Sequence, residues 1–170
     1  KSINGRIEKV GNLKNKATVI LDYAHTPHAL KTLILDIKKD FPLSELSLVF
    51  GCGGDRDKDK RSMMGNIAQN YCNNIYLTDD NPRFEDPKLI RNQIKNGLNK
   101  KKFHEIPSRL QAINTAINKL KSGDVLLVVG KGHENYQEYK DKSFFSDKLE
   151  ILRSIKNRNR ILSNSIKTNI

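Results

Sequence analysis

Residues 74–98, NIYLTDDNPRFEDPKLIRNQIKNGL, place an apolar run, a polar loop and an amphipathic segment in immediate succession. Asn74–Thr78 has the composition of a short strand that is buried on both faces. Pro87 suits the first turn of a helix and Gly97 suits its end. Four apolar residues between them recur at helical spacing: Leu89, Ile90, Ile94 and Leu98. A strand that leads directly into a helix is the repeating unit of an α/β fold.

The same unit recurs along the chain. Three further runs have strand character, Ala17–Leu21, Leu46–Phe50 and Asp124–Val129, and Phe103–Ile106 is a weaker candidate. Helical faces alternate with them: Leu30, Leu33, Ile34 and Ile37; Met63, Met64, Ile67 and Ala68; and Leu110, Ile113, Ile117 and Leu120, with Ser108 as an N-cap. This alternation predicts a three-layer α/β sandwich with a mostly parallel sheet and crossover helices.

The C-terminal part breaks this alternation. Residues 136–147, YQEYKDKSFFSD, alternate weakly about Asp141-Lys142 and predict a short hairpin ahead of a last helix, roughly Asp147–Lys156. We therefore expect a domain over residues 13–156. Residues 1–12 carry little core and are interpreted as a connector, and residues 157–170 as a frayed basic tail.

Composition limits the classes of protein that the chain can be. Its 170 residues suit one domain, and it has no run of about 18 apolar residues, so no membrane span is expected. Cys52 and Cys72 lie outside any metal-ligand spacing and indicate reduced thiols in a cytoplasmic protein. The 31 basic and 19 acidic residues give a net charge of +12, which would attract polyanions. A nucleic-acid-binding module is thus one alternative, although the eleven aromatic residues show no stacking arrangement with basic ones.

An unusual polar loop follows each of the four main strands. These are DYAHTP at 22–27, GCGGDRDKDKR at 51–61, DDNPR at 79–83 and GKGHENYQ at 130–137. Because the carboxyl ends of parallel strands meet at one edge of a sheet, the four loops should converge there. That gathers ten polar residues into one neighbourhood: Asp22, His25, Arg56, Asp79, Asp80, Asn81, Arg83, Lys131, His133 and Glu134.

Each loop also has a purely structural interpretation. The glycines could serve only a tight turn, DDNPR could be an Asx-turn, and Asp55 and Asp57 could tie Arg56 into a local ion-pair cluster. Taken together, however, the loops suit a zwitterion. Carboxylates such as Asp80 and Glu134 can hold an ammonium group, while Arg56 and Arg83 can each bind a carboxylate. Two arginines imply two acid groups, so we expect a small amino acid with a second acidic end.

The motifs also resemble a known family. LDYAHTPHAL, VFGCGGDRDKDKR, TDDNPRFEDP and VVGKGHENYQ, in this order and spacing, are similar to the C-terminal domain of the Mur ligases, in particular to those that add meso-diaminopimelate. The resemblance runs from about Gly5 to Asp147. It implies a Rossmann-like fold and a cytoplasmic, ATP-dependent ligase that adds meso-diaminopimelate to UDP-MurNAc-L-Ala-D-Glu. That reaction belongs to peptidoglycan synthesis, and therefore to cell wall biogenesis, cell shape and cell division.

The resemblance also implies roles for individual residues. The meso-diaminopimelate contacts would be Arg56, Asp80, Asn81, Pro82, Arg83, Gly130 and Glu134, with Arg83 at the distal carboxylate that lysine lacks. The nucleotide-facing residues would be Arg6, Asp22 and His25. No catalytic residue and no metal ligand is expected in this chain, because the family holds ATP and Mg²⁺ mainly in a central domain that would precede Lys1. On this interpretation the chain is inactive alone. A stand-alone amino-acid-binding protein is a further alternative.

Overall fold

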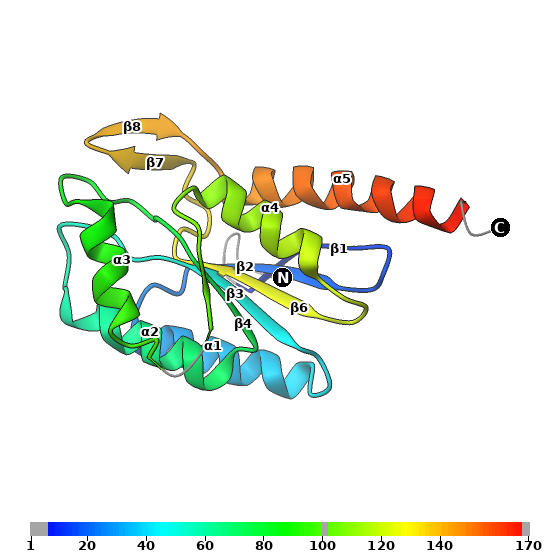
Figure 1. Cartoon of the computed structure of the whole chain (residues 1–170), viewed down its shortest axis with the longest axis horizontal. Coiled ribbons are helices and arrows are strands. Elements are labelled where there is room, and N and C mark those ends of the chain that lie inside the picture. Colours follow the sequence, from blue (N-terminus) through cyan, green and yellow to red (C-terminus); the bar gives the residue numbers. More distant parts are fainter. Residues whose placement is uncertain (1–6, 100–101, 168–170) are drawn as a thin grey trace.

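A six-stranded, mostly parallel sheet forms the centre of the molecule (Figure 1). The computed structural model describes residues 7–99 and 102–167. The strands are β1 (Glu8–Asn12), β2 (Thr18–Asp22), β3 (Leu46–Phe50), β4 (Asn74–Leu77), β5 (His104–Glu105) and β6 (Val125–Val129). Their order across the sheet is β1-β2-β6-β3-β4-β5, and every pairing is parallel except that of β1 with β2. The predicted α/β class is thus confirmed.

Helices cover both faces of this sheet and complete the predicted three layers. Helices α1 (Pro27–Asp40), α2 (Asp59–Tyr71) and α3 (Pro87–Lys95) share one apolar core with alternate residues of the strands. Helices α4 (Arg109–Lys119) and α5 (Asp147–Lys167) share a second core on the opposite face (Figure 1). Because both faces are packed, β2, β3 and β6 are buried along their whole length, as their continuous apolar sequences indicate.

Short polar residues and glycines fix where the helices begin and how closely they pack. The side chains of Thr26, Asp86 and Ser108 accept backbone N–H groups at the starts of α1, α3 and α4. Gly97 follows α3 and lies against α2, where a β-carbon would stand 2.0 Å from the carbonyl oxygen of Ser62. Gly97 therefore permits close packing of two helices, besides lying near a helix end.

The structure differs from the sequence-based prediction in two terminal segments. Residues 8–12, expected in a connector, form the antiparallel edge strand β1, whose Gly11 packs against Ile155 of α5. Helix α5 continues to Lys167, so residues 157–167 are helical and not a frayed tail. Its apolar face, which includes Ile151 and Ile155, packs onto the second core, while Asn159 accepts the backbone N–H of Lys14 at 2.7 Å. Residues 1–6 and 168–170 lie outside the described residues. Neither α5 nor any other described helix is long and apolar enough to cross a membrane.

The predicted hairpin is present as β7 (Tyr136–Tyr139) and β8 (Asp141–Phe144). It turns at Lys140, whose φ of 63° is left-handed, and therefore one residue before the expected position. The hairpin forms a separate two-stranded sheet beside the main one (Figure 1). It extends from the loop after β6, so it stands next to the edge where the polar loops meet.

Candidate functional site

A hollow of about 530 Å³ lies at the carboxyl ends of the parallel strands, the edge at which such sheets bind ligands. Residues from all four polar loops border it, as the parallel order of the strands predicts. They are Tyr23, His25, Thr26, Gly51, Cys52, Gly53, Arg56, Asp57, Lys60, Asp80, Asn81, Arg83, Gly130, Glu134 and Tyr136. The hollow thus combines cationic and anionic side chains in one place.

Arg83 and Arg56 supply guanidinium groups in different ways. Arg83 is largely enclosed: its Nη1 donates to the carbonyl oxygen of Gly54 at 2.7 Å, and its Nε lies 3.3 Å from a carboxylate oxygen of Glu138. Arg56 is exposed at the mouth of the hollow. Asp55 and Asp57 do not hold Arg56 in an ion-pair cluster; their carboxylates accept the backbone N–H groups of Phe84 and Asp59. Arg56 therefore remains available to a ligand.

Asp80 and Glu134 supply the negative charges. Asp80 is buried, and a β-carbon on Gly130 would lie 2.6 Å from its Oδ2. Gly130 has a φ of +111°, so glycine is required there both by the backbone and by the space that Asp80 occupies. Oε2 of Glu134 accepts the side-chain amide of Asn81 at 3.0 Å. The two acids therefore border the hollow from neighbouring loops.

Lys131 lies beneath the hollow and joins two of its loops. Its side chain is fully buried, and Nζ donates to Oδ1 of Asn81 at 2.8 Å and lies 3.4 Å from Oε2 of Glu134. Burial lowers the pKa of Lys131, while the carboxylates of Asp80 and Glu134 act in the opposite direction. Lys131 thus orients the amide and the carboxylate that face the hollow, although it does not border the hollow itself.

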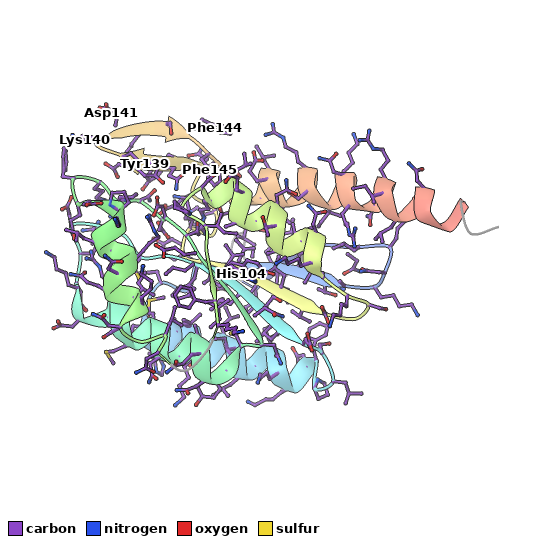
Figure 2. All side chains as sticks on the ribbon, viewed as in Figure 1. His104, Tyr139, Lys140, Asp141, Phe144 and Phe145 are labelled. Carbon is purple, nitrogen blue, oxygen red and sulfur yellow. The ribbon has the colours of Figure 1, made fainter. Side chains whose placement is uncertain are left out.

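The hairpin holds the DDNPR loop in place. Gln137 donates to the carbonyl oxygen of Asp80 at 2.8 Å, and the hydroxyl group of Tyr139 donates to Oδ2 of Asp79, also at 2.8 Å. The other carboxylate oxygen of Asp79 binds the guanidinium group of Arg91. Figure 2 shows Tyr139, Lys140 and Asp141 together at the hairpin's outer end. Asp79 therefore serves the structure of the loop, whereas Asp80 and Arg83 face the hollow.

The residues expected to face the nucleotide do not all border the main hollow. Asp22 borders a second hollow of about 370 Å³, and His25 borders both hollows. The two carboxylate oxygens of Asp22 accept the backbone N–H groups of Ile7 and Ala24 at 2.7 and 2.6 Å. Asp22 thus shapes its loop. Arg6 lies outside the described residues, and Pro82 is buried and does not border either hollow.

Sequence reasoning missed several residues that border the main hollow. Tyr23 and Tyr136 are aromatic neighbours of the charged positions, and burial together with Glu134 raises the pKa of both hydroxyl groups. Lys60 reaches across to the backbone oxygen of His25 at 3.0 Å. Cys52 is buried, and this burial raises the pKa of its thiol to about 12. All four residues lie within the polar loops that follow the strands. Their position in these loops is the sequence feature that could have indicated that they border the hollow.

Metal binding is not supported by the side chains in the described ranges. Across residues 7–99 and 102–167, no group of three or more histidine, cysteine, aspartate or glutamate side chains could hold a metal ion. The fold and the hollow define an α/β domain with a charged hollow at the carboxyl edge of its sheet.

Comparisons with known proteins agree with this class. The family model described as "Mur ligase, glutamate ligase domain" matches residues 5–132. A UDP-N-acetylmuramoyl-L-alanyl-D-glutamate–2,6-diaminopimelate ligase of Rickettsia felis is 48% identical over 156 residues, which are 91% of this chain and 29% of that protein. The ligase of the same name from Chlorobium phaeobacteroides is 49% identical over 154 residues, 89% of this chain and 30% of that protein.

Solved structures give the same result. A ligase of that name has a TM-score of 0.84 and 37% identity, and the match covers 93% of this chain and 32% of the other. The chain belongs to the Mur ligase family. Its expected similarity to the C-terminal domain of the diaminopimelate-adding members, the MurE ligases, is confirmed. It spans about a third of the length of the relatives that it matches.

Proposed function

We propose that this chain is the amino-acid-binding domain of an ATP-dependent ligase that adds meso-diaminopimelate to UDP-MurNAc-L-Ala-D-Glu in peptidoglycan synthesis. The names of the relatives specify 2,6-diaminopimelate as the substrate of those proteins. Because the reaction consumes ATP, we place it in the cytoplasm. We assign the relatives' substrate to this chain because of the charged residues that border its own hollow.

One observation carries the proposal: charges of both signs border the same hollow. Arg56 and Arg83 lie on its border together with Asp80 and Glu134. meso-Diaminopimelate carries two carboxylates and two ammonium groups, so each of its charges would meet an opposite charge. The volume of about 530 Å³ is within the usual range for small-molecule sites. A ligand with a single charge would contact only part of this set.

Arg83 would determine the choice of amino acid. Its guanidinium group is largely enclosed, so an ion pair there is screened less than one at an exposed surface. meso-Diaminopimelate has a carboxylate at its distal end, whereas L-lysine has none. Only meso-diaminopimelate can therefore add a charged hydrogen bond to Arg83 from its distal end, and such bonds contribute about 1.5–3 kcal/mol. Lysine should therefore bind more weakly.

The chain's own residues would bind and orient the amino acid. Asp80 and Glu134 would accept hydrogen bonds from the ammonium groups, and Asn81 and Lys131 would keep the Glu134 carboxylate in position. When bound, ATP supplies the phosphoryl group that activates the acceptor carboxylate, and attack by the amine then gives the amide, ADP and phosphate. This domain would present the amine and close over that reaction.

The nucleotide side fits this chain only in part. The second hollow, of about 370 Å³, has an apolar lining that includes Ala24 and Leu33, with His25 at its border, and could contact a flat ring system. The described residues offer no acid cluster for Mg²⁺. We therefore propose that other parts of the ligase hold the metal and most of the ATP.

Calorimetry on this chain tests the proposal. Wild type, Arg83→Ala and Arg160→Ala would each be titrated with meso-diaminopimelate and with L-lysine. We expect weak but measurable binding of meso-diaminopimelate by the wild type, at least about tenfold tighter than L-lysine. Arg83→Ala should lose this preference. Arg160, an exposed arginine of α5, is the matched control and should have no effect.

Two results would oppose the proposal. Equal affinity of the wild type for the two amino acids would remove the argument for specificity. Absence of amino-acid binding, together with binding to DNA that weakens steeply as the salt concentration rises, would favour the polyanion-binding alternative.

A further inference from the structure

One hairpin fixes both the backbone and the side chain of Arg83. The backbone N–H of Arg83 donates to the carbonyl oxygen of Glu138, and its carbonyl oxygen accepts the N–H of Lys140, both at 2.9 Å. These bonds hold Arg83 at a φ of 56°, in the left-handed region that is unfavourable for a residue with a β-carbon. The orientation of Arg83 is therefore imposed by strand β7 and not by the DDNPR loop alone.

Glu138 adds a charge to this contact. Its Oε2 lies 3.3 Å from Nε of Arg83, and both side chains are mostly enclosed, at 16% and 19% exposure. The opposite edge of the guanidinium group is held by Gly54, whose carbonyl oxygen accepts Nη1. Arg83 borders the main hollow, whereas Glu138 does not. Glu138 thus approaches the guanidinium group from outside the hollow that a ligand would enter.

A second cation, Lys142, lies on the opposite strand of the hairpin. Lys142 pairs with Glu138 across the hairpin, but its side chain is exposed and its Nζ stands over the ring of Tyr136, 4.7 Å from the centroid. The backbone N–H of Glu138 donates to Asn81. Among residues 7–99 and 102–167, the Glu138 carboxylate makes its ion pair with Arg83.

We propose that Glu138 is the resident counter-ion of Arg83 and sets how strongly the site holds a second carboxylate. Without Glu138, the enclosed guanidinium group would carry an uncompensated positive charge. With it, an incoming carboxylate must share the guanidinium group with a carboxylate already in place, and the two negative charges oppose each other. Glu138 does not line the hollow and acts through Arg83, so it is a positioning residue that tunes affinity and specificity. For meso-diaminopimelate the inference rests on the proposed function.

The test uses acetate as a minimal carboxylate and the Nε–H signal of Arg83 in ¹⁵N NMR spectra as the reporter. Wild type, Glu138→Gln, Glu138→Asp and Asp141→Asn would each be titrated with acetate, meso-diaminopimelate and L-lysine. Glutamine keeps an oxygen for Nε but removes the charge. Asp141 lies at the exposed tip of the same hairpin (Figure 2), so Asp141→Asn controls for the change in net charge.

We expect Glu138→Gln to bind acetate and meso-diaminopimelate about threefold to tenfold more tightly than the wild type. Its affinity for L-lysine, which has no second carboxylate, should not change. Glu138→Asp, which keeps the charge, and Asp141→Asn should behave like the wild type. A merely structural role of Glu138 would not increase affinity for carboxylates selectively.

The outcomes separate this inference from the proposed function. If Glu138→Gln binds acetate no more tightly than the wild type, or more weakly, the counter-ion role is overturned and Glu138 only holds the guanidinium group in place. If acetate binds more tightly to Glu138→Gln but no variant binds meso-diaminopimelate, the counter-ion role stands and the proposed substrate is wrong.

Discussion

Arg109 and Asp147 form a fully buried ion pair with two contacts, Nε to Oδ1 at 2.7 Å and Nη2 to Oδ2 at 2.6 Å. Nη2 also donates to the carbonyl oxygen of Val129 at 2.9 Å. The pair therefore joins the first turn of α4, the first turn of α5 and the end of β6. Since the GKGHE loop begins directly after Val129, this buried contact fixes the position from which Gly130, Lys131 and Glu134 extend.

Removing one member of this pair should destabilise the fold strongly. Asp147→Ala leaves the Arg109 charge buried without its partner, and we expect the free energy of unfolding to fall by about 3–5 kcal/mol. Urea denaturation followed by circular dichroism measures this. The control is Arg153→Ala on the same helix, where the pair with Glu150 is largely exposed on the arginine side and should contribute at most about 1 kcal/mol. Equal losses in the two variants would contradict the prediction.

Gly53 controls the place of the Arg83 guanidinium group. A β-carbon on Gly53 would lie 2.9 Å from Nη1 of Arg83, the end of a flexible side chain, so Gly53→Ala should displace Arg83 without disturbing the fold. We expect calorimetry to show about threefold to tenfold weaker binding of meso-diaminopimelate, with stability within about 1 kcal/mol of the wild type.

The neighbouring glycine provides the contrast. A β-carbon on Gly54 would stand 1.8 Å from the carbonyl oxygen of Pro82, so backbone must move. Gly54→Ala should lower stability by about 1–3 kcal/mol. If Gly53→Ala destabilised the chain as much as Gly54→Ala, the glycine at 53 would serve the backbone and not Arg83.

The sequence was most informative where local pattern and topology agree. Continuous apolar strands that alternate with amphipathic helices require a parallel sheet, and a parallel sheet requires its strand-end loops to meet. This topology predicts that Arg56, Asp80, Arg83 and Glu134 lie close together, and all four border the main hollow. The direct binding roles of these residues stay predictions.

The contacts that hold the site could not be predicted in the same way. Gln137 and Asp80 are 57 residues apart, and nothing in the local sequence indicates that a hairpin residue donates to that carbonyl oxygen. The length of α5 was missed for another reason: basic residues after Lys156 were interpreted as a solvated tail. Leu162 nevertheless continues the apolar face of Ile151 and Ile155 and packs on the second core. Tertiary packing, not composition, determines that helix.

Glu85 should make the fold sensitive to acid. Its hydrogen bond and ion pair with the buried Arg61 lower the pKa of Glu85 from 4.5 to about 2, although burial acts in the opposite direction. A lowered folded-state pKa gives stability that is complete above about pH 4.5 and is lost as the pH falls toward 2. Thermal unfolding would be measured between pH 6 and pH 2. Over this range the free energy of unfolding of Glu85→Gln should fall by about 1–2 kcal/mol less than that of the wild type. Parallel curves for the two proteins would oppose this assignment.

Cys52 borders the main hollow but should be chemically inert in the folded chain. Its side chain is 4% exposed, its Sγ lies 3.7 Å from Sδ of Met64, and burial raises its pKa to about 12 despite the nearby cations Lys60 and Arg61. Because the thiolate is the reactive form, its reaction with Ellman's reagent at pH 8 should be at least about a hundredfold slower in the native chain than in urea. The measurement uses Cys72→Ala, so that Cys52 is the only thiol, and the urea-unfolded sample of the same variant is the control. A native rate within about tenfold of the unfolded rate would contradict the prediction. It would mean that the Cys52 thiol is ionised and open to solvent.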